Sequence, residues 1–284
     1  MWLKDCHVHI VGLGLMGASL ALALRGKVAR RSGSDIDTAV VHEAIADGTI
    51  DASGEREQAD IVVLAAPADA NLRLLAELAL KPGALVIDLG GSKTAICNLM
   101  DTLPEHITAV GGHPMCGIAE NGYQNAFATL YAGARFILCA TVRTTDTARG
   151  LAEQLVAACG AMPLWMDRAR HDQTAGAISH LPHLVSFALM RLAMGLSEQN
   201  GDVFEMAAGG FDGATRLART NEAMISGMFL TNEAQLRALV DDLRRHLDDL
   251  TALLDDPPAL RAELERIVAA RRAYTEQYGE RMIT

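Results

Sequence analysis

A glycine-rich turn close to the N-terminus constrains the fold of this 284-residue chain more than any other feature. The turn Gly12-Leu13-Gly14-Leu15-Met16-Gly17 follows the apolar run 7–13 and leads into a helical stretch at 18–24. A buried strand that passes through three such glycines into a helix is typical of a dinucleotide-binding α/β fold. The turn therefore predicts a strand, a nucleotide site and a helix, in that order.

The same turn supplies the first candidate binding residues. Gly12 permits the tight turn, Gly14 lets the backbone approach a pyrophosphate, and Gly17 lets the helix pack close to the strand. The free N–H groups at the helix start, near Leu15 and Met16, face the phosphates. We assign to the cofactor site Gly12, Gly14, Leu15, Met16 and Gly17, together with Pro67, which follows the apolar run 61–65.

An acidic residue at the end of the second strand would accept hydrogen bonds from the adenosine ribose of the cofactor. Asp35, eighteen residues after Gly17, stands at this point. It favours NAD over NADP, because a carboxylate repels the additional phosphate of NADP. Asp37 is a second candidate for the ribose contact. Arg30 and Arg31 keep NADP open as the alternative, because arginine side chains can hold that phosphate.

Short apolar runs recur through the first part of the chain, with helical stretches such as 69–80 and 145–159 between them. Continuous apolar runs, rather than alternating ones, indicate strands that are buried on both faces of a mostly parallel sheet. We therefore predict an α/β fold with a doubly wound, Rossmann-type nucleotide-binding domain over residues 1–166. The runs lie at 7–13, 61–65, 85–88, 108–112, 135–139 and 162–165.

The strand signal ends near residue 166, and residues 167–284 are predicted to form an all-α helical domain. Leucines and one valine between Leu236 and Leu254 recur at three- and four-residue spacing, with charged residues mainly on the other side of the helix. Pro257 and Pro258 end this helix, and a second helix runs over 259–278. The leucine stripe is interpreted as intramolecular core, with a subunit interface as the alternative.

Composition limits the classes of function. The formal net charge is −10, so no basic surface for nucleic acid is expected. The sequence contains no run of 18 apolar residues, so no membrane span is predicted. The five cysteines are scattered without a CxxC pair, which favours reduced thiols over disulfides or a metal site. The first ten residues lack the layout of a signal peptide. We expect a cytoplasmic enzyme that acts on a small molecule without a metal.

The glycine turn by itself is also similar to that of the β-hydroxyacid dehydrogenases, which use a lysine from the helical domain as acid and base. The lysines of this chain stand at positions 4, 27, 81 and 93, and none follows position 93. That interpretation therefore lacks its catalytic residue.

Further motifs are spread between the apolar run 85–88 and residue 218. They are Asp88-Leu89-Gly90-Gly91-Ser92-Lys93, Gly111-Gly112-His113-Pro114-Met115 with Gly117, Leu130-Tyr131-Ala132-Gly133, His171-Asp172, Ser179-His180-Leu181-Pro182-His183, and Gly210-Phe211 followed by Thr215-Arg216-Leu217-Ala218. In order and approximate spacing they resemble the prephenate/arogenate dehydrogenases of tyrosine biosynthesis. That family implies a nucleotide-binding domain followed by a helical domain, and a homodimer formed through the C-terminal helices.

The resemblance implies an NAD-dependent oxidoreductase that converts prephenate to 4-hydroxyphenylpyruvate with loss of CO2. His113 matches the catalytic histidine, which is neutral and accepts a hydrogen bond from the ring hydroxyl. Arg216 matches an arginine that grips a substrate carboxylate. His183 matches a second histidine on the substrate side, whereas His180 resembles a helix-packing residue. Ser92 matches a serine near the nicotinamide and the hydroxyl.

One departure from the family pattern lies beside the expected catalytic serine. The pattern is closer to Asp-x-x-Ser-x-Lys, whereas here Gly91 takes the place of the serine and Ser92 follows one residue later. Ser92 is therefore expected to face differently, and Thr94 is a candidate substitute. This altered spacing, together with a departure near Ile118, leaves a non-catalytic NAD-binding sensor as a remote alternative function.

Two further departures concern the choice of substrate. Gly-Thr-Glu often follows the His-Pro motif, but here Ile118 and Ala119 come first and Glu120 stands one residue late. Gly213 stands three residues before Arg216, where relatives that use arogenate can place an acidic partner for its ammonium group. An ammonium without such a partner is costly to bury, so we expect prephenate as the substrate. Arogenate or 4-amino-4-deoxyprephenate is the alternative.

Overall fold

The computed structural model of the chain describes residues 1–118 and 120–279. The fold divides into two compact units after Glu233. The first unit contains the sheet and the helices that follow it up to Glu233, and the second begins at Ala234. The helices directly after residue 166 belong to the first unit, so this division does not test the domain boundary predicted at residue 166. That boundary stays a prediction.

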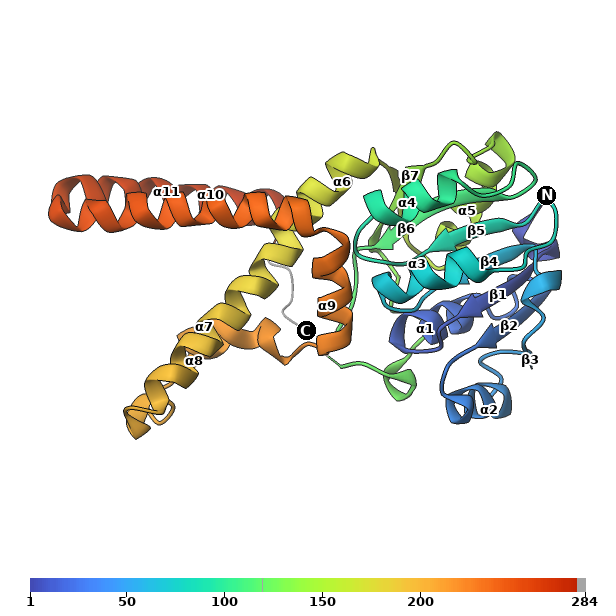
Figure 1. Cartoon of the computed structure of the whole chain (residues 1–284), viewed down its shortest axis with the longest axis horizontal. Coiled ribbons are helices and arrows are strands. Elements are labelled where there is room, and N and C mark those ends of the chain that lie inside the picture. The colour runs from blue at the N-terminus through green and yellow to red at the C-terminus, as the bar shows by residue number, and fades with distance from the viewer. Residues whose placement is uncertain (119, 280–284) are drawn as a thin grey trace. The chain divides into compact units, whose positions relative to one another are not determined.

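Within the described residues, the first unit is built on one eight-stranded sheet with the order β3-β2-β1-β4-β5-β6-β7-β8 (Figure 1). Neighbouring strands from β3 to β6 are parallel, β7 runs antiparallel to β6, and β8 is parallel to β7. The predicted α/β fold is confirmed. The strands are β1 (His7–Val11), β2 (Arg30–Ser34), β3 (Ala52–Ser53), β4 (Ile61–Leu64), β5 (Leu85–Asp88), β6 (Thr108–Pro114), β7 (Arg135–Ala140) and β8 (Met162–Trp165).

Helices cover both faces of the sheet. Residues of α1 (Leu15–Ala23), α2 (Thr38–Ala46) and α5 (Asp146–Ala158) share one hydrophobic cluster with Val8 and Ile10 of β1. Residues of α3 (Ala68–Glu77) and α4 (Thr94–Asp101) belong to a second cluster. Strands between the two layers are buried on both sides, which explains their continuous apolar sequences.

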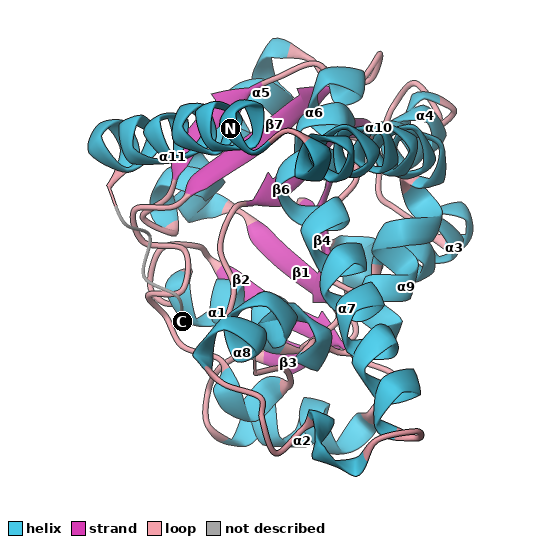
Figure 2. Ribbon diagram, turned by 90° about the vertical axis from the view of Figure 1, so that its left-hand side faces the viewer, coloured by secondary structure: helices cyan, strands magenta, loops and turns pink. Residues whose placement is uncertain are grey.

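The helices after β8 include α6 (Arg168–Ala175), α7 (Leu181–Ser197), α8 (Gly209–Thr215) and α9 (Glu222–Thr231). A π-helical turn, Gly176–His180, joins α6 to α7. Pro182 explains this turn, because it lacks an N–H group and its ring clashes with the carbonyl one turn earlier. Figure 2 shows α9 beside α3, where a Cβ on Gly227 would lie 2.7 Å from the side chain of Asp69.

The continuous helical segment Arg168–Ser197 is long and apolar enough to cross a membrane by length and composition, and a single such helix is weak evidence for a span. Its apolar side chains are largely exposed in the described chain. Leu192 and Met194 of α7 are 62% and 52% exposed.

The second unit contains α10 (Glu233–Ala252), a short turn Leu253–Asp255, and α11 (Pro257–Tyr278). Pro257 begins α11 rather than only ending α10, because proline is preorganised for the first turn of a helix. Asp256 caps that turn by accepting from the N–H of Ala259 at 3.1 Å. Leu247 and Leu254 are 54% and 65% exposed. The interpretation of the leucine stripe as intramolecular core is therefore wrong for these two residues.

Candidate active site

The glycine turn has the geometry that a bound dinucleotide needs. Gly12 has φ +96°, and a Cβ there would lie 2.9 Å from the backbone of Ala65. A Cβ on Gly17 would lie 1.9 Å from the carbonyl oxygen of Gly12, so α1 could not approach the turn with a larger residue. Gly14, by contrast, has no neighbour within 4 Å of that position. The turn is tight where it meets the protein and open at Gly14, where a pyrophosphate would lie.

The other predicted residues at this turn lie around its opening. Leu15 is the first residue of α1 and is buried, whereas Met16 is half-buried. Pro67 is exposed and directly precedes α3, two residues after Ala65, whose backbone lies beside Gly12. The N-terminus of α1 and the loop after β4 therefore flank the same opening.

Asp35 lies directly after β2 and holds the glycine turn in place. Its carboxylate accepts from the N–H of Leu13 at 2.6 Å and from the N–H of Asp37 at 2.9 Å. A carboxylate oxygen has two lone pairs, so these bonds leave capacity for a ribose hydroxyl. Asp37 instead caps the N-terminus of α2, where its side chain accepts a hydrogen bond from the N–H of Ala39. This arrangement fits Asp35 as the ribose acceptor.

The arginines that could favour NADP are engaged elsewhere. Arg31 is buried, and its guanidinium pairs with Asp51 at 2.6 Å. Arg30 pairs with Glu55 at 2.8 Å. Arg31 also stands four residues before Asp35, which corresponds to about 13 Å along a strand. The surroundings of Asp35 therefore fit NAD rather than NADP.

A buried ion pair connects β5, β6 and the start of α4. The side chains of Lys93 and Asp88 are 0% and 2% exposed and form a direct ion pair. Nζ of Lys93 also donates to the carbonyl of Gly112 at 2.6 Å, and Asp88 accepts from the N–H of Gly112 at 3.0 Å. The backbone immediately before His113 is thus held on both sides. A Cβ on Gly112 would lie 2.4 Å from the carbonyl oxygen of Asp88, so only glycine fits there.

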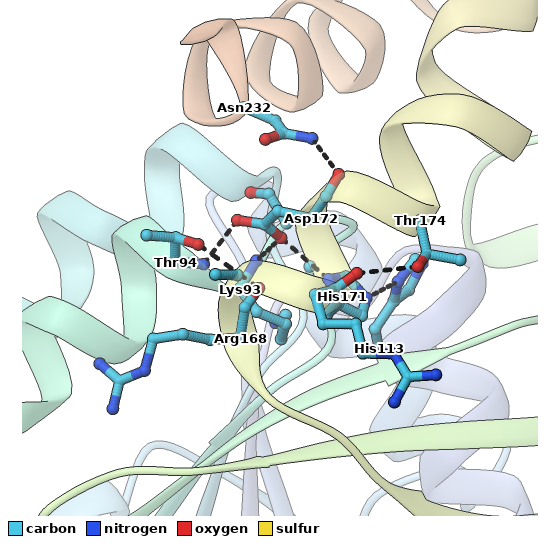
Figure 3. Close-up of polar contacts among 12 residues, drawn as sticks. Lys93, Thr94, His113, Arg168, His171, Asp172, Thr174 and Asn232 are labelled. Atoms are coloured by element: carbon cyan, nitrogen blue, oxygen red, sulfur yellow. Dashed lines mark hydrogen bonds and ion pairs between the residues drawn. The ribbon is translucent and has the colours of Figure 1, made fainter. Parts of the chain in front are cut away.

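His113 projects from the end of β6 toward α6, where it meets His171 (Figure 3). Nδ1 of His113 lies 2.8 Å from Nε2 of His171, and Nδ1 of His171 lies 2.8 Å from Oδ1 of Asp172. Asp172 in turn accepts from the backbone N–H groups of Lys93 and Thr94 at 2.6 and 2.7 Å. This chain of contacts ties together the end of β6, the start of α4 and α6.

Burial lowers the pKa of His113 well below its usual value, and the nearby His171, Lys93 and His180 lower it further. The imidazole is therefore neutral at physiological pH. Burial would raise the pKa of Asp172, but its hydrogen bonds outweigh this effect and the pKa is lowered. Asp172 is therefore an ionised acceptor.

Ser92 is 2% exposed, and its hydroxyl donates to Oγ1 of Thr231 in α9 at 2.6 Å. The hydroxyl of Thr231 in turn donates a hydrogen bond to the carbonyl of Gly227 at 2.7 Å. The hydrogen bond described for Ser92 thus connects it to α9 rather than to His113. Thr94, the candidate substitute, contributes its N–H to Asp172, and its hydroxyl approaches the carbonyl of Arg168 at 3.4 Å.

His180 lies in the π-helical turn and is fully buried. Its Nδ1 accepts from the side-chain amide of Asn232 at 3.0 Å, and the same amide donates to the carbonyl of Asp172. In the described part of the chain, Nε2 of His180 has no hydrogen-bond partner. Burial lowers the pKa of His180 to about 4, so this histidine is also neutral. The position that a Cβ on Gly91 would take is 3.8 Å from Nε2 of His180.

His183 lies on α7, where its Nδ1 donates to the carbonyl of Ser179 at 2.9 Å. Burial lowers the pKa of His183, and the positive charge of Arg216 adds to this effect. The short helix Arg216–Arg219 is tied to α7 by a hydrogen bond from the N–H of Ala218 to Ser186 at 3.0 Å.

Gly213 faces open space, with no atom within 4 Å of where its Cβ would be. Asp212, adjacent to Gly213 in the sequence, and Glu120, which follows the His-Pro motif, are both exposed. Ala119, at one of the departures from the family pattern, lies outside the described residues. No group of three or more potential metal ligands occurs among residues 1–118 and 120–279.

Lys93, His171 and Asp172 have no role predicted from the sequence, although all three stand in the motifs that carry the resemblance. The sequence feature that could have identified them is that charged and polar residues follow the ends of predicted buried strands. Only the fold shows that they meet at His113.

Two family models match the chain. The prephenate dehydrogenase nucleotide-binding domain matches residues 20–163, and the prephenate dehydrogenase dimerization domain matches residues 167–268. The prephenate dehydrogenase of Bacillus subtilis is 31% identical over 259 residues, which cover 86% of this chain and 69% of the relative.

Solved structures of full-length similarity point the same way. The prephenate dehydrogenase of Aquifex aeolicus, in complex with hydroxyphenyl propionate and NAD+, is 28% identical with a TM-score of 0.87, over 94% of this chain and 98% of that one. The arogenate dehydrogenase of Synechocystis is 29% identical with a TM-score of 0.78, over 94% and 99% of the two chains. The predicted cofactor, NAD, is confirmed, and the chain belongs to the prephenate dehydrogenase family of NAD-dependent oxidoreductases.

Proposed function

We propose that the chain catalyses the oxidative decarboxylation of prephenate to 4-hydroxyphenylpyruvate. The observation that carries this proposal is the neutral imidazole of His113, which lies at the end of β6 with one ring nitrogen bound by His171. A neutral, positioned histidine can accept the proton of a ring hydroxyl. Bound NAD supplies the acceptor for the hydride that leaves the carbinol carbon.

The remaining site residues hold the substrate for this step. His113 takes the hydroxyl proton while the carbinol carbon becomes a carbonyl carbon. Arg216 binds a substrate carboxylate, for which a planar and permanently charged guanidinium is suited. His183 contacts the substrate from α7, on which the short helix that carries Arg216 packs, and Ser92 lies on the nicotinamide side. The ring carboxylate then leaves as CO2, its bonding electrons aromatise the ring, and the product oxygen regains a proton.

Prephenate rather than arogenate is the proposed substrate because of Gly213. Arogenate carries an ammonium group where prephenate carries a ketone, and an ammonium removed from water needs a carboxylate close by. Gly213 offers no side chain three residues before Arg216, and Asp212 is exposed on the adjacent position. The similarity to the Synechocystis arogenate dehydrogenase keeps arogenate as the second candidate.

The functional molecule is proposed to be a cytoplasmic homodimer formed through the helical domain at 167–284. The match to a dimerization domain over residues 167–268 and the exposed apolar side chains of α7 support this assembly. Light scattering from the purified protein should give twice the chain mass of 30.3 kDa. A monomeric mass at micromolar concentration would contradict the homodimer.

One assay separates the candidate functions. Purified protein is mixed with NAD and with prephenate, arogenate or 4-amino-4-deoxyprephenate in turn, and NADH formation is followed by absorbance. We expect the highest kcat/KM for prephenate. A higher kcat/KM for arogenate would identify arogenate as the substrate. NAD binding without turnover of any of the three compounds would instead support a non-catalytic NAD-binding sensor.

A further inference from the structure

We propose that His171 and Asp172 are positioning residues that hold His113 in one tautomer, the form in which Nε2 is free to accept the substrate proton. This inference rests on the proposed function, since it presumes that His113 is the acceptor. It adds two residues to the machinery of the reaction, neither of which contacts the substrate in order to act.

The direction of the hydrogen bonds begins at Asp172. Its carboxylate accepts from two backbone N–H groups at the start of α4, those of Lys93 and Thr94. An ionised carboxylate has no hydrogen to donate, so the contact of 2.8 Å with His171 requires a hydrogen on Nδ1 of His171.

The next step fixes the ring of His113. A neutral imidazole carries one hydrogen, so His171 with its hydrogen on Nδ1 has a bare Nε2. That nitrogen can only accept, and the contact of 2.8 Å therefore requires a hydrogen on Nδ1 of His113. Nε2 of His113 is consequently bare. A bare Nε2 is what an acceptor for the hydroxyl proton needs, and the opposite tautomer would present a hydrogen instead.

One additional proton reverses this arrangement. If the proton settles on His171, Nε2 of His171 donates to His113, whose own hydrogen then moves to Nε2. If the proton settles on His113, Nε2 carries a hydrogen as well. In both cases the acceptor is lost, so a single protonation should switch the enzyme off as the pH falls.

The groups that face His113 from the surrounding segments influence the pH at which it protonates. Lys93 at the start of α4 and His180 in the π-helical turn oppose protonation of His113, and Asp172 on α6 favours it. These surroundings favour an unprotonated His113 at physiological pH. Activity should be constant at high pH and fall with unit slope on the acid side.

Substitutions of His171 test the proposal more cleanly than substitutions of Asp172, which also caps α4. His171→Gln keeps an acceptor near the position of Nε2, because the glutamine carbonyl can receive the hydrogen of His113. His171→Leu removes that acceptor with little change in volume. Thr174→Val is a matched control on the same helix, because its exposed hydroxyl bonds only within α6 in the described contacts.

We expect kcat of His171→Leu to fall by about 10²–10⁴, the range associated with a misplaced acid or base, with unchanged affinity for NAD. His171→Gln should remain within about tenfold of the wild type, and Thr174→Val should match it. Thermal unfolding of each variant separates this pattern from a loss of fold. Equal kcat values and pH profiles for the wild type and His171→Leu would overturn the proposal.

A readout that does not depend on the substrate separates this proposal from the proposed function. Nitrogen-15 NMR of protein labelled at histidine reports which ring nitrogen carries hydrogen. We expect His113 to carry it on Nδ1 in the wild type and to lose this preference in His171→Leu. A hydrogen on Nε2 of His113 in the wild type would overturn the tautomer assignment even if prephenate is turned over. Failure to oxidise prephenate would contradict the proposed function alone.

Discussion

Replacing Lys93 with methionine should strongly destabilise the fold, because it leaves the carboxylate of Asp88 buried without its cation. The side chains of this pair are 0% and 2% exposed, so water cannot take the place of the ammonium group. Breaking a buried pair by removing one partner typically costs about 3–5 kcal/mol. The carbonyl of Gly112 also loses the donor that lies 2.6 Å away. We therefore expect Lys93→Met to lower the free energy of unfolding by about 3–5 kcal/mol.

The measurement is equilibrium unfolding in urea, with a matched control and a double substitution. Lys81→Met breaks the ion pair with Asp60, which has a similar distance of 2.6 Å but a lysine side chain that is 34% exposed. That change should cost about 1 kcal/mol or less. Asp88→Asn combined with Lys93→Met removes both buried charges, and the pair should be less destabilised than the sum of the single changes. A loss below about 1 kcal/mol for Lys93→Met would refute the reasoning.

Four further predictions concern catalysis, specificity and acid stability. His113→Asn should lower kcat by about 10²–10⁴ while NAD binding survives in calorimetry; near-normal turnover would remove His113 from the mechanism. Asp35→Ser should weaken NAD binding and relax discrimination against NADP; a wild type that already prefers NADP would contradict this role. Arg216→Ala should raise the KM for substrate strongly and spare NAD affinity, because the loss of a charged contact costs roughly 2–5 kcal/mol; an equal loss of both affinities would indicate a structural role. Burial lowers the pKa of His9 and His180 to about 4; the unfolded chain binds more protons below pH 6.5, so unfolding titrations should show stability falling from pH 6.5 to about 4, by up to roughly 3 kcal/mol per histidine.

Most of the strands that could be predicted from the sequence are buried between two helical layers, and the exposed edge strand β8 is the exception. Their apolar runs end within about two residues of the observed strands, because both faces of β4 and β5 require hydrophobic side chains. β2 carries no such run, since its sequence is Arg30-Arg31-Ser32-Gly33-Ser34. Its polar side chains are satisfied within the fold instead. Ser32 contacts His7 at 2.7 Å and His9 at 2.8 Å, and this pairing depends on neighbours that only the folded sheet supplies.

The site could be predicted only in part, for a related reason. The glycine turn is a local feature, and the steric demand at Gly17 comes from the adjoining Gly12 and Ile10, although the backbone that Gly12 approaches belongs to the distant Ala65. His113 and His171 are 58 positions apart, and Lys93 and Gly112 are 19 apart. Sequence spacing carries no information on such contacts. The leucine stripe on α10 shows the same limit, because periodicity identifies an apolar face without identifying what covers it.

The buried Lys93 links the stability of the fold to the chemistry of the site. Burial of an ion pair is a poor way to stabilise a protein, because desolvation of the two charges offsets much of their attraction. Here the pair holds the backbone of Gly112, one residue before His113, and the positive charge of Lys93 also lowers the pKa of His113. An apolar pair of similar volume would supply neither effect. The hydrogen bonds from Lys93 and Thr94 to Asp172 place the same short segment at the other end of the histidine array. The start of α4 therefore sets both the position of His113, through Gly112, and its tautomer, through Asp172 and His171.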